Sequence, residues 1–263
     1  MGQLVANGIS VHVNDAGPQD RPAIVMSNSL AADLGMWDAQ AEALAKTYRV
    51  LRFDARGHGR TQATPGDYTL DLLVDDVIAL LDAHGIQKAH FVGLSLGGMI
   101  GQRIAERAPD RIASLVLCAT FAEAPFDLWD QRVTTVRKSG IAPLIDGTLL
   151  RWFTPAFAET SPHIVDKARR MIAATSVDGY AGCAAAIRDM DLKTAPESIK
   201  MPTLILAAEN DPSATPEMMK HLHARISGAE FQLLPACAHV FTMERPTDAT
   251  GAIGSFLERN WRA

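Results

Sequence analysis

The sequence has few cysteines and no long apolar run. Only three cysteines occur among its 263 residues, Cys118, Cys183 and Cys237. Their odd number and irregular spacing argue against both a disulfide framework and a metal-binding cluster. No run of about 18 apolar residues is present, and the opening residues MGQLVANGIS lack the basic and apolar parts of a signal peptide. We therefore expect a soluble, cytoplasmic protein with reduced thiols.

Clusters of basic residues are also missing. The net charge is -5, and the lysines and arginines are spread along the chain. Neither nucleic acid nor an anionic membrane is therefore an expected partner. With 48% hydrophobic and 21% charged residues, the chain is long enough for one large domain or for a core domain with an insertion.

The strongest functional motif is AHFVGLSLGGMIG at residues 89–101, with Ser95 at the centre of GLSLG. An apolar, strand-like run precedes the serine and a helical pattern follows it. A serine on such a turn is typical of a nucleophile elbow. Residues 93 and 97 must then be small, because a Cβ there would collide with the adjoining strand or helix. A Gly-Ser loop is the alternative for so short a pattern, but the strand before and the helix after it favour a catalytic serine.

The rest of the chain alternates between strand-like and helical patterns. A hairpin around Asn7-Gly8 opens it. Further strands are expected at 23–27, 48–53, 111–118, 202–208 and 229–234. Helices are expected at 37–46, 69–84, 98–108, 216–226 and 248–259. This order predicts an α/β fold with a mostly parallel sheet flanked by helices on both faces.

Residues 121–196 interrupt this alternation. The segment has no strand-like run and consists of helical pieces separated by prolines and glycines. We interpret it as an all-helical lid inserted into a core made of residues 1–120 and 197–263. Its aromatic and cationic side chains suit the cover of a pocket, although most of the aromatics could simply pack the insertion onto the core.

A nucleophilic serine needs a base and an acid, which in an elbow enzyme follow it in the order acid, then histidine. Asp211 and His239 each follow a predicted strand in that order. Glu209 competes for the role of the acid, but Asp211 lies at the tip of the turn formed by Asn210 and Pro212. The sequence therefore predicts the triad Ser95, Asp211 and His239.

An oxyanion hole would need two backbone donors. The N–H of Leu96, directly after the serine, supplies one, and the N–H of Leu30, in the loop after the strand at 23–26, supplies the other. The pair His221 and His223 is the most suggestive of a metal site, yet residues two apart on a helix do not face each other. We expect neither a metal nor an organic cofactor.

Along its whole length the chain resembles the α/β-hydrolases, which implies an eight-stranded sheet. Within that superfamily it is similar to the 3-oxoadipate enol-lactonases of the β-ketoadipate pathway of aromatic catabolism. The segments that carry the closer similarity are SNSL with MW at 27–37, LRFDARGHG at 51–59, GLSLGG at 93–98, RWFTP at 151–155 and GYAGCAAAIRDMDL at 179–192. The chain differs at Ala31, where glycine is usual, and at Phe241-Thr242, where a small polar pair is usual.

The resemblance implies a serine hydrolase that opens a small lactone or ester by acyl transfer to water, with no cofactor. The enol-lactone of that pathway carries a carboxylate, which a mostly apolar pocket would bind poorly without a cation. Arg132 best matches the family's lid arginine. We expect Trp129 and Trp152 to contact the substrate together with it.

Other functions remain open at this point. A general carboxylesterase or a cofactor-free perhydrolase of the haloperoxidase type would use the same triad, and comparing an anionic enol-lactone with a neutral p-nitrophenyl ester would separate them. A non-catalytic ligand receptor on this fold is an alternative of a different class, which stoichiometric rather than repeated hydrolysis would favour. The expected partner is a small lactone or ester, and the sequence is compatible with an oligomer.

Overall fold

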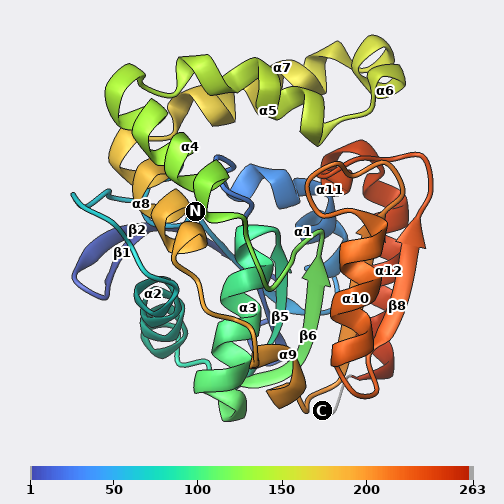
Figure 1. The fold of residues 1–263 in the computed structure, drawn as a ribbon. Coiled ribbons are helices and arrows are strands. Elements are labelled where there is room, and N and C mark those ends of the chain that lie inside the picture. The colour runs from blue at the N-terminus through green and yellow to red at the C-terminus, as the bar shows by residue number, and fades with distance from the viewer. Residues whose placement is uncertain (1, 261–263) are drawn as a thin grey trace.

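The computed structural model describes residues 2–260; residue 1 and residues 261–263 of the predicted core lie outside it. Its strands are β1 (Gly2–Ala6), β2 (Ile9–Ala16), β3 (Ala23–Ser27), β4 (Arg49–Phe53), β5 (Ala89–Leu94), β6 (Ile112–Cys118), β7 (Thr203–Ala208) and β8 (Glu230–Leu234). Within the described residues they form one eight-stranded sheet in the order β1-β2-β4-β3-β5-β6-β7-β8 (Figure 1). The pairs β1-β2 and β2-β4 are antiparallel and the others parallel, which confirms the predicted fold class.

The position of each strand in the sheet follows from its sequence. β1 and β2 join through Asn7 and Gly8, whose φ angles of 45° and 75° are those of a tight hairpin turn, as the sequence predicts. β5, β6 and β7 are buried along their whole length, because both faces of a central parallel strand are covered. β8 lies at the edge of the sheet, and three of its five residues are exposed.

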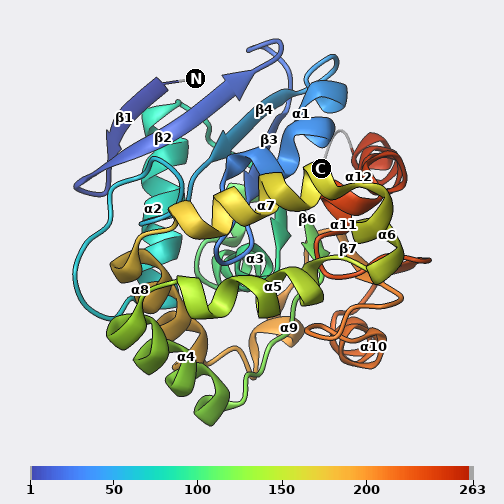
Figure 2. The ribbon, with the colours of Figure 1, turned by 90° about the horizontal axis from the view of Figure 1, so that it is seen from above.

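Helices cover both faces of the sheet. They are η1 (Leu34–Trp37), α1 (Asp38–Leu44), α2 (Leu70–Ala83), α3 (Leu96–Arg107), η2 (Pro109–Arg111), α10 (Pro216–Arg225), α11 (Phe241–Glu244) and α12 (Pro246–Arg259). Seen from above, α2, α3 and α10 lie on one side of the sheet, and α1 and α12 on the other (Figure 2). α2 begins after Thr69, whose hydroxyl accepts from the Leu72 N–H at 3.1 Å, and it ends before Gly85, as predicted.

Between β6 and β7, the described chain forms helices and loops alone. These helices are α4 (Phe126–Ser139), η3 (Ala142–Leu144), α5 (Ile145–Trp152), α6 (Pro155–Thr160), α7 (Pro162–Ala174), α8 (Val177–Arg188) and α9 (Ala195–Ser198). α4 packs on α8 and α5 on α7, and these four stand above one end of the sheet in Figure 1. We refer to α4 through α8 as the lid. Whether residues 121–196 behave as a separate unit stays a prediction.

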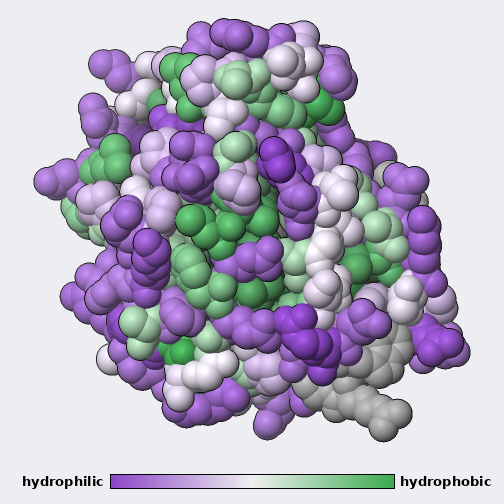
Figure 3. All heavy atoms as spheres, turned by 90° about the vertical axis from the view of Figure 1, so that its right-hand side faces the viewer, coloured by the Kyte–Doolittle hydropathy of each residue, from purple (hydrophilic) through white to green (hydrophobic). Residues whose placement is uncertain are grey.

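The lid leaves apolar surface at its lower boundary. On the side of the molecule that carries α10 and β8, apolar side chains gather between the helices at the top and the core below (Figure 3). None of the helices within residues 2–260 is both long and apolar enough to cross a membrane.

Candidate active site

Ser95 occupies the turn between β5 and α3. Its φ of 56° and ψ of -112° are unfavourable for any residue with a Cβ. Surrounding hydrogen bonds hold this conformation. The Ser95 N–H donates to the Cys118 carbonyl at 2.9 Å, and the Thr120 hydroxyl donates to the Ser95 carbonyl at 2.8 Å. The strained turn thus projects the serine side chain beyond the end of the sheet.

The small residues around Ser95 are required by close backbone contacts. A Cβ at Gly93 would lie 2.2 Å from the carbonyl oxygen of Gly97, and a Cβ at Gly97 would lie 2.2 Å from that of Ser27. Both distances are far shorter than any van der Waals contact, so helix α3 could not approach the sheet with larger residues. These contacts agree with the packing expected from the sequence.

Asp211 and His239 come from the loops after β7 and β8 and form a hydrogen-bonded pair. The Nδ1 of His239 lies 2.8 Å from Oδ2 of Asp211, and both residues are buried. The other oxygen of Asp211 accepts from the N–H groups of Ser213 at 2.7 Å and Ala214 at 3.1 Å. These bonds fix the carboxylate so that one oxygen faces the imidazole. Glu209 instead accepts from the Ala236 N–H on the exposed side of the loop.

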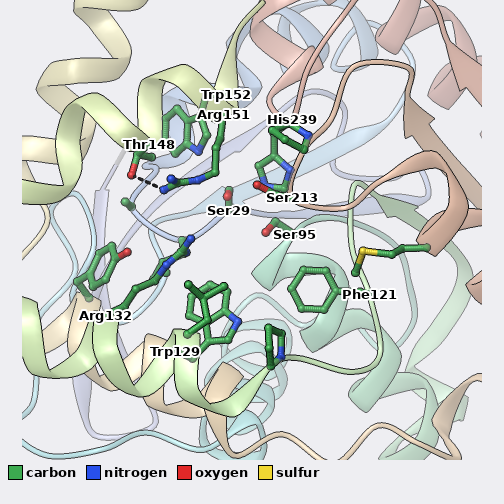
Figure 4. A pocket seen from close by; sticks show the side chains of 17 residues that line it. Ser29, Ser95, Phe121, Trp129, Arg132, Thr148, Arg151, Trp152, Ser213 and His239 are labelled. Atoms are coloured by element: carbon green, nitrogen blue, oxygen red, sulfur yellow. Dashed lines mark hydrogen bonds between the residues drawn. The ribbon is translucent and has the colours of Figure 1, made fainter.

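Ser95 and His239 line one cavity of about 390 Å³. Figure 4 shows both residues on the same side of this cavity, with Ser29 beside them and the lid residues opposite. The geometry brings a hydroxyl, an imidazole and its carboxylate partner together at the end of the parallel strands, which is where α/β folds place their ligands. The catalytic role of the three residues remains a prediction.

The two proposed oxyanion donors belong to Leu30, which lines the cavity with Ser95, and to Leu96, which directly follows Ser95. Within residues 2–260, neither the N–H of Leu30 nor that of Leu96 donates to another protein group. The Leu30 loop is held against α3, because the Gly97 N–H donates to the Asn28 carbonyl at 3.0 Å. Ala31, which replaces the usual glycine, has a φ of 67°, so it adopts the left-handed conformation that glycine favours.

The lid covers the cavity with aromatic and cationic side chains. Trp129 and Arg132 reach it from α4, and Arg151 and Trp152 from α5. The Arg132 Cζ lies 4.4 Å from the centre of the Trp129 ring. The two side chains therefore share one helix face, as their spacing of three residues predicts. All three substrate contacts expected from the sequence, Trp129, Arg132 and Trp152, line the cavity.

Arg151 is a second pocket cation that the sequence analysis did not single out. Its guanidinium donates to the Thr148 hydroxyl at 3.1 Å, and Figure 4 shows it on the same side of the cavity as Arg132. Its position in RWFTP marked it as part of a distinctive segment. The sequence of that segment does not indicate that Arg151 from α5 and Arg132 from α4 line the same cavity.

Neither pocket arginine is neutralised by the protein. Among the ion pairs of the described residues, none joins Arg132 or Arg151 to a carboxylate. Burial lowers the pKa of Arg151, and the nearby charge of Arg132 lowers it further. Burial also raises the pKa of Tyr180 on α8, although both arginines oppose that shift. The lid half of the cavity is therefore positively charged and available to an anion.

Comparisons with known proteins place these residues in a family. Residues 22–140 match the family described as alpha/beta hydrolase fold. Over 257 residues the chain is 35% identical to 3-oxoadipate enol-lactonase 2 of Acinetobacter baylyi, a match that covers 97% of this chain and 96% of that protein. The chain belongs to this family of α/β-hydrolases.

Solved structures agree with the family assignment. The enol-lactonase from Burkholderia xenovorans LB400 superposes with a TM-score of 0.95 and 37% identity, covering 98% of this hydrolase and 100% of that chain. A thermophilic esterase from Thermogutta terrifontis, solved with malate bound, has a TM-score of 0.93 and 26% identity, covering 99% and 98%. These matches support an enzyme that hydrolyses lactone or ester bonds. They do not favour a carboxylesterase, a perhydrolase or a non-catalytic receptor, because both enol-lactonases are more similar to the chain than the esterase is.

The two histidines of α10, the pair most suggestive of a metal site, can be placed in the structure. His223 on α10 pairs through Nε2 with the Ala229 carbonyl at 2.9 Å, and His221 lies on the same helix. In the part of the chain that the structure describes, no group of three or more metal-binding side chains is gathered.

Proposed function

We propose that this hydrolase opens an enol-lactone that carries a free carboxylate, and that 3-oxoadipate enol-lactone is its substrate. The observation that carries the proposal is the composition of the cavity. Ser95 and His239 lie on the core side, whereas Arg132 and Arg151, both without a carboxylate partner in the described chain, lie on the lid side. A ligand with a reactive carbonyl at one end and a carboxylate at the other matches this arrangement.

In the first half of the reaction, the imidazole of His239 takes the proton of Ser95 as Oγ attacks the lactone carbonyl. Asp211 holds the imidazole in the required orientation and stabilises the positive charge that it gains. The backbone N–H groups of Leu30 and Leu96 receive the negative charge that forms on the carbonyl oxygen.

Collapse of the tetrahedral intermediate breaks the bond between the carbonyl carbon and the ring oxygen. The departing enol oxygen takes the proton that His239 accepted from Ser95, and the enol then converts to the ketone. A water molecule gives a proton to the same imidazole and attacks the acyl group on Ser95. The second intermediate releases the carboxylic acid and restores the serine hydroxyl. No step requires a metal or an organic cofactor.

Arg132 is the proposed partner of the substrate carboxylate. It stacks on Trp129 and points into the cavity, so the aromatic ring limits its rotation (Figure 4). A guanidinium restricted in this way loses little side-chain entropy when it binds a carboxylate.

We also propose that the enzyme works in the cytoplasm, since its three cysteines are free and buried.

The test is a kinetic comparison with the purified enzyme. We expect kcat/KM for 3-oxoadipate enol-lactone to exceed that for a neutral lactone of the same ring size by about 30-fold or more. This ratio corresponds to about 2 kcal/mol for one charge-assisted contact. A p-nitrophenyl ester serves as a second neutral substrate. Equal or faster turnover of the neutral substrates would refute the enol-lactone assignment and restore the general carboxylesterase.

A further inference from the structure

Glu244, on the short helix α11, is a buried carboxylate that the mechanism does not use. The residue is 5% exposed. Its Oε1 accepts from the N–H of Thr154 at 3.1 Å and also from the Thr154 hydroxyl, and its Oε2 accepts from the N–H of Ala238 at 2.8 Å. Within residues 2–260 it forms no ion pair with an arginine, lysine or histidine. Three hydrogen bonds therefore hold the carboxylate, and Arg245 interacts with it electrostatically without forming an ion pair.

The donors come from two segments that meet at the cavity. Thr154 belongs to the connection between α5 and α6 in the lid, and Ala238 directly precedes His239. The same two segments are joined by their backbones. The His239 N–H donates to the Arg151 carbonyl at 3.3 Å, and the Val240 N–H donates to the Trp152 carbonyl at 3.1 Å. The histidine loop is thus attached to the end of the lid helix that carries Arg151.

A carboxylate is suited to this junction for a chemical reason. It presents two acceptor oxygens, so it can serve donors on two sides at once. A glutamine has one acceptor oxygen and a donating NH₂ group, which would face one of the N–H groups and repel it. Burial of an ionised side chain without an ion pair is costly, so a residue that merely filled space here would more often be neutral.

We propose that Glu244 is a positioning residue for His239. By fixing the N–H of Ala238 it sets the orientation of the imidazole between Asp211 and Ser95, and through Thr154 it links that orientation to the position of the lid. The inference rests on the proposed role of His239 as the base. It adds a residue, 33 positions away from the acid in the sequence, that acts on catalysis without touching the substrate.

The test is Glu244→Gln, which keeps the shape of the side chain but loses one acceptor. We expect kcat to fall by about tenfold to a hundredfold, because a small displacement of a reacting group has this effect. KM should stay within about twofold, since no substrate contact is changed. The anionic lactone and the neutral ester should lose kcat equally. The low-field proton resonance of the His239–Asp211 hydrogen bond should shift or broaden.

Glu209→Gln is the matched control. Glu209 also accepts from a backbone N–H of the same loop, that of Ala236 at 2.8 Å, but on the exposed side. Water can replace this bond, so we expect kcat within about twofold of the parent enzyme and an unchanged low-field resonance.

If Glu244→Gln does not fold, Glu244→Asp is the second test. It keeps both carboxylate oxygens but holds them on a shorter side chain, so the same loss of kcat is expected. A folded variant that keeps full kcat and the parent resonance, and loses only thermal stability, would overturn the proposal. Failure of the proposed function is a separate outcome, since it would show as poor turnover of the lactone by the parent enzyme. The neutral ester would then serve for the same comparison.

Discussion

Arg56 in the core and Arg151 in the lid meet opposite conditions. In the core, Nε of Arg56 donates to Asp76 at 2.8 Å and Nη2 donates to the other oxygen, so the hydrogen bonds from Asp76 raise the pKa of Arg56. In the lid, Arg151 has no carboxylate beside it within the described chain, and burial lowers its pKa. The same residue type is thus paired with a carboxylate in the core and left without one over the cavity.

The two halves of the cavity also differ in how their side chains are held. On the core side the strained Ser95, the Leu30 loop and the Asp211–His239 pair are held by backbone hydrogen bonds and by close glycine contacts. On the lid side the charges are held by a ring contact and by two hydroxyl groups, those of Thr148 and Tyr180. Changes in the core half should therefore affect the chemical step, and changes in the lid half should affect the choice of substrate.

The largest effect should come from the core half. We expect Ser95→Ala and His239→Ala each to lower kcat by about 10⁴-fold, because the two side chains act in a single proton transfer. The measurement is steady-state kinetics with the enol-lactone, with circular dichroism to show that each variant is folded. A folded variant that keeps most of the activity would contradict the assignment of the triad.

A second core effect concerns stability at low pH. Burial lowers the pKa of His90 on β5 to about 4, and burial also lowers the pKa of His58. Between pH 4 and the ordinary histidine value of about 6.5, the unfolded chain binds protons that the folded chain excludes. Stability is therefore full above about pH 6.5 and is lost as the pH falls towards 4. For His90 alone the loss is on the order of 3 kcal/mol, which is about a 300-fold change in the folding equilibrium.

Urea unfolding at a series of pH values measures this loss. His90→Asn, which cannot gain a proton, should flatten the curve between pH 4 and 6.5. Arg132→Ala removes no histidine, so it should leave the slope of the curve unchanged. An unaltered curve in His90→Asn would assign the acid sensitivity to other groups.

The lid half is tested by its two unpaired cations. We expect Arg132→Ala and Arg151→Ala each to raise KM for the anionic lactone by about tenfold, with kcat little changed, because each removes a charge-assisted contact to the carboxylate. KM for a neutral ester should stay the same.

Arg137→Ala is the control for these variants. Arg137 lies on α4 as well, but it pairs with Asp67 at the surface, where an ion pair contributes little. Its KM should stay within about twofold of the parent value. If both pocket variants slow the ester and the lactone equally, the arginines only support the lid.

The sequence predicts the core half far better than the lid half. The elbow and the hairpin depend on neighbouring residues, and the order of Ser95, Asp211 and His239 follows from the order of the strands. Arg132 could be placed because it lies three residues after Trp129 on one helix. These features need only local geometry or the rules of parallel sheets.

Arg151 and Glu244 were not predicted, because their roles depend on how distant segments pack. Arg151 matters only because α5 brings it to the cavity that α4 lines with Arg132. Glu244 receives two of its three hydrogen bonds from Thr154, 90 positions away in the sequence. No periodicity or motif reports such a contact. From the sequence alone, Glu244 cannot be told apart from an ordinary charged residue on the surface of a helix.

The smallest expected effect is a change in stability at Gly147, an exposed glycine in the lid helix α5. A Cβ there would meet only the Nη1 of Arg151, at an ordinary 3.5 Å. Because alanine favours a helix over glycine, Gly147→Ala should stabilise the fold by up to about 1 kcal/mol and raise Tm by about 2–4 °C. Gly97→Ala at the elbow should instead prevent folding or displace the oxyanion loop, since its Cβ would lie 2.2 Å from the Ser27 carbonyl oxygen. Thermal unfolding of both variants measures the contrast. A lower Tm for Gly147→Ala would contradict the open space that the structure gives this position.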